Sequence, residues 1–121
     1  PQPVIGFWFA LEDATLENGC LWALPGQHKN GLSSRFRRIN GRLQTETLPE
    51  APSFAENDGT PLEVAAGTLV VLHGALPHYS EANRSSKSRY AYTLHAISWA
   101  ADYPQDNWLQ RGRDLPLRRL S

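Results

Sequence analysis

The chain has 121 residues, of which 40% are hydrophobic and 20% are charged, so it is typical of one globular domain with a modest core. Its twelve basic and twelve acidic residues cancel, which gives no reason to expect nucleic acid as a partner. No apolar run approaches the roughly 18 residues of a membrane-spanning helix, and no signal-peptide leader is present, so no membrane partner is expected. The single Cys20 excludes an internal disulfide and favours an intracellular, cytoplasmic location.

The first predicted element is a strand at residues 4–11, VIGFWFAL, which is apolar throughout and expected to be buried on both faces. Asn18-Gly19 is a typical two-residue turn, and a short strand, CLWAL, follows it until Pro25-Gly26. Residues 29–60 are polar and rich in Gly, Ser, Asn and Pro. They predict a long excursion with a hairpin around RINGRLQTE.

The second half of the chain also has strand character. LEVAAGTLVVLHG is a β-rich run interrupted by Gly67, and RYAYTLHAISWA, residues 89–100, is the last strong strand. Neither face of that last strand is plainly polar, so both are expected to be covered. Five or six short strands separated by turn residues predict an all-β fold, a sandwich or a jelly roll, as one domain over residues 1–121.

One segment is locally basic, RFRRINGR at residues 35–42. A solvated face is the favoured interpretation of this segment, and an anion-docking patch is the alternative.

His78 is the first candidate site residue, because it follows a strand-like run and Pro77, where side chains can point into the mouth of a barrel. A neutral imidazole is a good ligand for iron, zinc or copper, although a lone histidine is more often structural. His73 lies five residues earlier and would face the other way on one continuous strand, so the two make a poor chelating pair.

Arg89 is the second candidate, since it begins a strand whose same-face neighbours Ala91 and Thr93 are small enough to leave space beside it. An inward arginine needs an anionic partner, and its planar fork suits a carboxylate held by two parallel hydrogen bonds. Ser80 could add a hydroxyl to the same carboxylate. The alternative is an internal salt bridge or an exposed strand end.

Two separated motifs resemble the phytanoyl-CoA dioxygenase family of Fe(II)- and 2-oxoglutarate-dependent oxygenases. In the C-terminal motif of that family, the metal-binding histidine is followed by serine at plus two and arginine at plus eleven, and His78, Ser80 and Arg89 hold those spacings. Residues 6–28 look like the strand segment of the same family, with its Asn-Gly turn and a Pro-Gly-x-His element. The likeness covers nearly all of the chain, is weakest at residues 30–60, and is greatest to the phytanoyl-CoA dioxygenase domain-containing subgroup.

The resemblance implies a double-stranded β-helix, or jelly roll, and a hydroxylating dioxygenase that uses Fe(II) and 2-oxoglutarate on a small-molecule substrate. His78 would be the distal histidine of a two-histidine, one-carboxylate iron site. Ser80 and Arg89 would hold the far carboxylate of 2-oxoglutarate, and Trp8 would lie against the cosubstrate, with core packing as its alternative role. No catalytic residue is implied beyond the metal site.

The family's other two iron ligands come from a His-x-Asp or His-x-Glu element upstream of the strand that opens this sequence. None of His28, His73 and His95 has an acidic residue two positions later, so the implied jelly roll is incomplete, without its N-terminal strands and this element. The chain could be the C-terminal part of a longer dioxygenase, could be completed by a second chain in a dimer, or could keep only a binding role. We expect the isolated 121 residues to bind 2-oxoglutarate weakly at best and to show no turnover.

The main alternative is a non-catalytic, cupin-like β-sandwich binding module, in which His78, Ser80 and Arg89 form a structural cluster. The two interpretations differ in whether Arg89 faces an open space or pairs with an internal carboxylate. The carboxylates of Glu12, Asp13 and Glu17 are expected to be turn and surface groups. A serine hydrolase is disfavoured, because no G-x-S-x-G elbow and no α/β alternation occur.

Overall fold

The computed structural model describes residues 4–54 and 58–119, so residues 55–57 of the predicted excursion lie outside the described residues. In the described part of the chain, no helix is long and apolar enough to cross a membrane. The elements are β1 (Val4–Ala10), β2 (Leu21–Ala23), the 3-10 helix η1 (Gln27–Asn30), β3 (Ser34–Ile39), β4 (Arg42–Thr47), β5 (Thr60–Leu62), β6 (Leu69–His73), β7 (His78–Ser80) and β8 (Ala91–Ile97). The all-β prediction is therefore confirmed.

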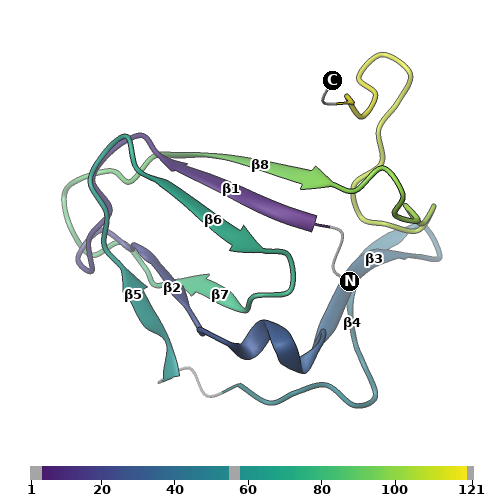
Figure 1. Cartoon of the computed structure of the whole chain (residues 1–121), viewed down its shortest axis with the longest axis horizontal. Coiled ribbons are helices and arrows are strands. Elements are labelled where there is room, and N and C mark those ends of the chain that lie inside the picture. The colour runs from purple at the N-terminus through teal and green to yellow at the C-terminus, as the bar shows by residue number, and fades with distance from the viewer. Residues whose placement is uncertain (1–3, 55–57, 120–121) are drawn as a thin grey trace.

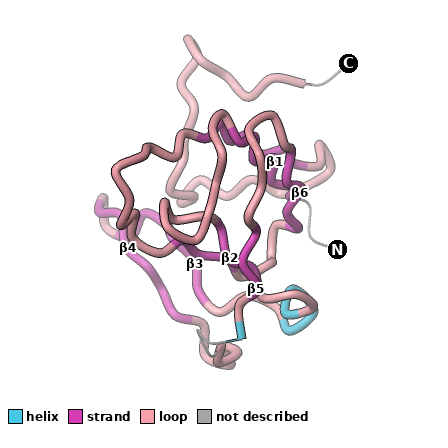
Figure 2. Tube along the Cα trace, turned by 90° about the vertical axis from the view of Figure 1, so that its left-hand side faces the viewer, coloured by secondary structure: helices cyan, strands magenta, loops and turns pink. Residues whose placement is uncertain are grey.

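The strands form two antiparallel three-stranded sheets and one hairpin. One sheet has the order β6-β1-β8, the other has the order β5-β2-β7, and β3 pairs with β4. Figure 1 shows the two three-stranded sheets one above the other, with the hairpin beyond one end of them, and Figure 2 shows η1 near the β5 end of the molecule. Because the chain changes sheet between β1 and β2 and again between β6 and β7, the arrangement is a partial jelly roll.

The hydrophobic core lies between the two sheets. Alternation along β1 directs Gly6, Trp8 and Ala10 inward, and all three are buried. Trp8, with 6% of its surface exposed, packs in one cluster with Leu72 of β6 and Leu21 of β2. The core is therefore small and has Trp8 as its largest member.

The prediction that residues 4–11 and 89–100 are covered on both faces is wrong. The side of β6-β1-β8 that points away from the core, the outer apolar face, is only partly covered in the described part of the chain. Its members are the half-buried Phe7 and Phe9 and the exposed Ile5, Leu69, Val71, Tyr92 and Leu94. Side chains of a strand alternate between two faces, and one packed sheet can cover only one of them.

The predicted hairpin is confirmed at β3 and β4. Ile39 pairs with Arg42, and the two residues between them, Asn40 and Gly41, have positive φ angles of 50° and 77°, as a tight turn of this type requires. Within the basic segment, Arg37 forms salt bridges with Glu46 and Asp106. The other three arginines of the segment are exposed, in keeping with a solvated face.

Candidate functional site

The strand β7 brings His78 and Ser80 to the same face of its sheet. His78 pairs with Ala23 and Ser80 with Leu21, so both side chains share the face of these two buried β2 residues, toward the space between the sheets. Tyr79 points the other way and stacks on a β2 side chain, Trp22, at 5.9 Å. Both His78 and Ser80 are exposed, so this part of the space between the sheets is open to solvent.

The imidazole of His78 has one nitrogen fixed and one available. Its Nδ1 lies 2.9 Å from the carbonyl oxygen of Leu76, and a carbonyl only accepts, so this contact requires the proton on Nδ1. The neutral ring then keeps a lone pair on Nε2, the form in which histidine binds a metal. A hydrogen bond from the second ring nitrogen to a carbonyl is also the usual support of a metal-ligating histidine.

Arg89, just before β8, reaches across to the same place. Its Nη2 lies 3.5 Å from Ser80 Oγ, its Cζ lies 5.7 Å from the centre of the Trp8 ring, and its Nε is buried without a hydrogen-bond partner. Among the described residues, no carboxylate forms a salt bridge with Arg89. A half-buried guanidinium with unused donors beside a hydroxyl fits an added carboxylate, since an unpaired charge away from water is costly.

The remaining histidines do not complete a metal site. His73 ends β6, which belongs to a different sheet from the β7 strand of His78. The ring of His73 contacts that of His28, with 4.7 Å between the ring centres. In the described ranges, no group of three or more His, Cys, Asp or Glu side chains could hold a metal ion. Within the described residues, His78 is therefore not part of a complete metal site.

Cys20 is buried close to this site but has no chemical role in it. Burial away from water raises the pKa of the Cys20 thiol, the negative charge of Glu63 raises it further, and the positive charge of Arg89 acts in the opposite direction. A thiol with a raised pKa stays protonated at neutral pH and is a poor nucleophile. Cys20 is therefore a packing residue of the core.

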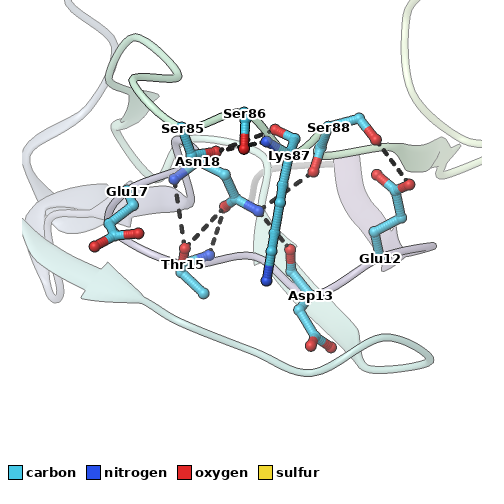
Figure 3. Close-up of a pocket in the computed structure, with 9 residues that line it drawn as sticks. All are labelled: Glu12, Asp13, Thr15, Glu17, Asn18, Ser85, Ser86, Lys87 and Ser88. Carbon is cyan, nitrogen blue, oxygen red and sulfur yellow. Dashed lines mark hydrogen bonds between the residues drawn. The ribbon is translucent and has the colours of Figure 1, made fainter.

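The loop that follows β1 holds a group of polar contacts that the sequence analysis missed. Glu12 was expected to be a surface group, but it is half-buried and accepts two hydrogen bonds from residues 88 and 90. Asn18, expected only as a turn residue, is 4% exposed and hydrogen-bonds to the same segment. Both line a cavity of about 480 Å³, drawn in Figure 3, whose lining does not include His78, Ser80 or Arg89. No local pattern predicts these contacts, because their partners lie about 70 or more positions away.

Gly19 is required at the end of this loop for two separate reasons, which a pair of variants distinguishes. Its φ angle is +83°, and an added Cβ would lie 2.7 Å from the carbonyl oxygen of Glu81. Gly26 has the same φ and nothing within 4 Å of its added Cβ. We expect Gly26→Ala to lower the free energy of unfolding by about 1–2 kcal/mol, the cost of the left-handed backbone. Gly19→Ala should lower the free energy of unfolding, measured in urea, by at least about 1 kcal/mol more. Equal losses in the two variants would show that the close approach of the Glu81 carbonyl does not affect stability.

The strand arrangement of this chain is that of a partial jelly roll, and the same arrangement occurs in solved structures. The chain matches two solved structures of comparable architecture, each of which it covers only in part. One is EvdO2 from Micromonospora carbonacea var. aurantiaca complexed with 2-oxoglutarate, with a TM-score of 0.63 and 27% identity over 87% of this chain and 42% of that one. The other is the non-heme monooxygenase ThoJ in its apo form, with a TM-score of 0.61 and 26% identity over 78% of this chain and 33% of that one.

The chain belongs to the phytanoyl-CoA dioxygenase family, because the family model matches residues 1–91. It is 47% identical to the phytanoyl-CoA dioxygenase of Arabidopsis thaliana over 93% of this chain and 40% of that protein. It is 45% identical to the phytanoyl-CoA dioxygenase domain-containing protein 1 of Mus musculus over 97% of this chain and 41% of that protein. The chain thus spans about 40% of the length of these relatives.

Proposed function

We propose that this chain supplies one iron ligand and the cosubstrate-binding residues of an Fe(II)- and 2-oxoglutarate-dependent dioxygenase. The observation that carries the proposal is Arg89, a half-buried guanidinium without a carboxylate partner among the described residues, 3.5 Å from the hydroxyl of Ser80. A purely structural cluster, as in a non-catalytic binding module, would be expected to pair this charge internally. The EvdO2 relative, complexed with 2-oxoglutarate, supports the choice of cosubstrate.

Each side chain has a role that its chemistry allows. When bound, iron and 2-oxoglutarate supply the activation of oxygen for hydroxylation, with conversion of the cosubstrate to succinate. Arg89 would donate two parallel hydrogen bonds to the far carboxylate, and Ser80 would donate a third through its hydroxyl. His78 would offer Nε2 to the iron, held in orientation by the carbonyl of Leu76. Trp8 would form an apolar wall that excludes water from one side of the cosubstrate.

We also propose that polypeptide outside these 121 residues, from the same enzyme, covers the outer apolar face and completes the iron site. The chain spans about 40% of its relatives, and the outer apolar face exposes a contiguous set of large side chains on three neighbouring strands. A symmetric dimer through this face is the competing arrangement. Sedimentation over a range of concentrations distinguishes them, since the dimer would persist in a chain extended to the length of its relatives.

The function is tested by placing this chain in the corresponding region of the Arabidopsis relative and measuring succinate formed from 2-oxoglutarate with Fe(II). We expect turnover by the chimera, and His78→Ala should reduce it by about 100-fold or more, since loss of even a supporting contact of a metal ligand can cost up to that amount. His73→Ala is the matched control, because His73 lies on the other sheet, and it should stay within about threefold of the parent. Undiminished turnover in His78→Ala would refute the assignment of the iron ligand.

A further inference from the structure

We propose that Glu12 and Asn18 are positioning residues that hold the backbone on both sides of Arg89 and so aim its guanidinium at the cosubstrate. This inference rests on the proposed function of Arg89. Glu12 Oε1 accepts a hydrogen bond from Ser88 Oγ at 2.8 Å, and Oε2 accepts one from the Tyr90 backbone N–H, also at 2.8 Å. One carboxylate therefore bridges the two neighbours of Arg89, as Figure 3 shows for its contact with Ser88.

Asn18 adds a third contact from the buried side of the loop. Its Nδ2 donates to the carbonyl oxygen of Ser88 at 3.3 Å and to that of Asp13 at 2.8 Å, while its Oδ1 accepts from the Thr15 N–H at 2.7 Å. Only 4% of Asn18 is exposed, so these bonds are shielded from water and costly to leave unmade. The amide thus connects the loop after β1 to the residue that precedes Arg89.

The direction of the Arg89 side chain follows from this arrangement. The side chain of Ser88 lies toward Glu12 and that of Arg89 lies toward Ser80 and Trp8, so the contact that fixes Ser88 also fixes the side on which Arg89 lies. The Tyr90 carbonyl also accepts a hydrogen bond from the Leu11 N–H at 3.0 Å, which extends the β1–β8 pairing up to this point. Fixing an arginine side chain costs rotamer freedom, so holding the backbone on both sides of it lowers the cost of ordering it on binding.

The loop before Arg89 does not need Glu12 for its own shape. Asn83 closes that loop through its amide, which donates to the carbonyl of Lys87 at 2.6 Å and accepts from the N–H of Ser85 at 2.9 Å. The contacts of Glu12 begin only at Ser88, where the chain leaves the loop and approaches Arg89. The carboxylate of Glu12 therefore holds the backbone around Arg89, whereas the hydrogen bonds of Asn83 hold the turn of the loop.

The test compares Glu12→Ala with two matched variants of the chain. Glu12→Gln is the conservative replacement, because its amide can accept from the Tyr90 N–H and donate to Ser88 Oγ with the charge removed. Asp13→Ala is the control, since Asp13 is the neighbouring carboxylate and also accepts a backbone hydrogen bond, at 2.8 Å from Ala66, but its side chain forms no hydrogen bond with residues 88–90. A loss of fold stability alone should affect Glu12→Ala and Asp13→Ala alike.

The first readout needs no ligand: the NMR order parameter of the Arg89 Nε–H bond. We expect it to fall below about 0.6, the flexible range, in Glu12→Ala and to stay near the parent value in Glu12→Gln and Asp13→Ala. Equal values in Glu12→Ala and Asp13→Ala would overturn the positioning role.

The second readout is the affinity for 2-oxoglutarate, measured by titration of the cosubstrate into the chimera with the Arabidopsis relative, because the isolated chain is expected to bind weakly at best. It should fall about tenfold in Glu12→Ala and less than about threefold in Glu12→Gln and Asp13→Ala. An affinity in Glu12→Ala equal to that of the parent would overturn the inference. If the parent chimera binds no 2-oxoglutarate, the proposed function of Arg89 fails, while the order parameter still decides whether Glu12 fixes the arginine.

Discussion

Arg89→Ala is expected to weaken the binding of 2-oxoglutarate to the chimera with the Arabidopsis relative by at least about 30-fold. The guanidinium is half-buried, has no carboxylate partner among the described residues, and reaches the hydroxyl of Ser80. A hydrogen bond to a charged group contributes about 1.5–3 kcal/mol, the guanidinium would donate two of them, and each 1.4 kcal/mol is about a factor of ten in affinity. The measurement is a titration of the chimera with 2-oxoglutarate, carried out on the parent and on the variant.

Two further variants separate the shape of the arginine from its charge. Arg89→Lys keeps the charge but loses the planar fork, so we expect an intermediate loss of about tenfold. Arg84→Ala is the control, because Arg84 is an exposed arginine in the loop of the same segment, and its affinity should stay within about twofold of the parent. An equal loss in Arg84→Ala and Arg89→Ala would mean that net charge alone attracts the cosubstrate, and that Arg89 forms no specific pair.

The strands were predictable from the sequence where local chemistry determines them. The apolar run at residues 4–11 and the alternation at 89–100 correspond to β1 and β8, and the Asn40-Gly41 turn places the hairpin. The covering of their faces was not predictable, because a strand sequence reports how apolar each face is and contains no information about what packs on it. The outer apolar face is therefore hydrophobic in sequence and partly exposed in the described residues.

The candidate site was predictable only as far as its short-range spacing. The three residues His78, Ser80 and Arg89 lie within 12 positions of the sequence. Ser80 ends β7 and Arg89 comes just before β8, and the fold brings these two side chains together. Glu12 is separated from Ser88 by 76 positions and from Tyr90 by 78 positions. Contacts over such separations cannot be predicted from a local sequence pattern. The supporting contacts of a site depend on tertiary packing, whereas the residues that touch a ligand can follow a motif.

Trp8→Ala should lower the free energy of unfolding by about 3–5 kcal/mol, the largest effect of any single truncation in this core. Trp8 is 6% exposed and packs against core residues of both sheets, so its removal leaves a cavity between them. Trp99→Ala is the matched control, because Trp99 is 79% exposed, and urea unfolding should show a loss below about 1 kcal/mol. Similar losses in the two variants would contradict the placement of Trp8 in the core.

A second tryptophan variant distinguishes core packing from a wall against the cosubstrate. Trp8→Phe keeps an aromatic ring in the core and should recover more than half of the stability lost in Trp8→Ala. The centre of the Trp8 ring also lies 5.7 Å from Arg89 Cζ, so the smaller ring withdraws contact area from the guanidinium and would do so from a cosubstrate bound there. A stable Trp8→Phe chain with several-fold weaker 2-oxoglutarate binding would assign the wall to Trp8, whereas unchanged binding would leave it as a packing residue.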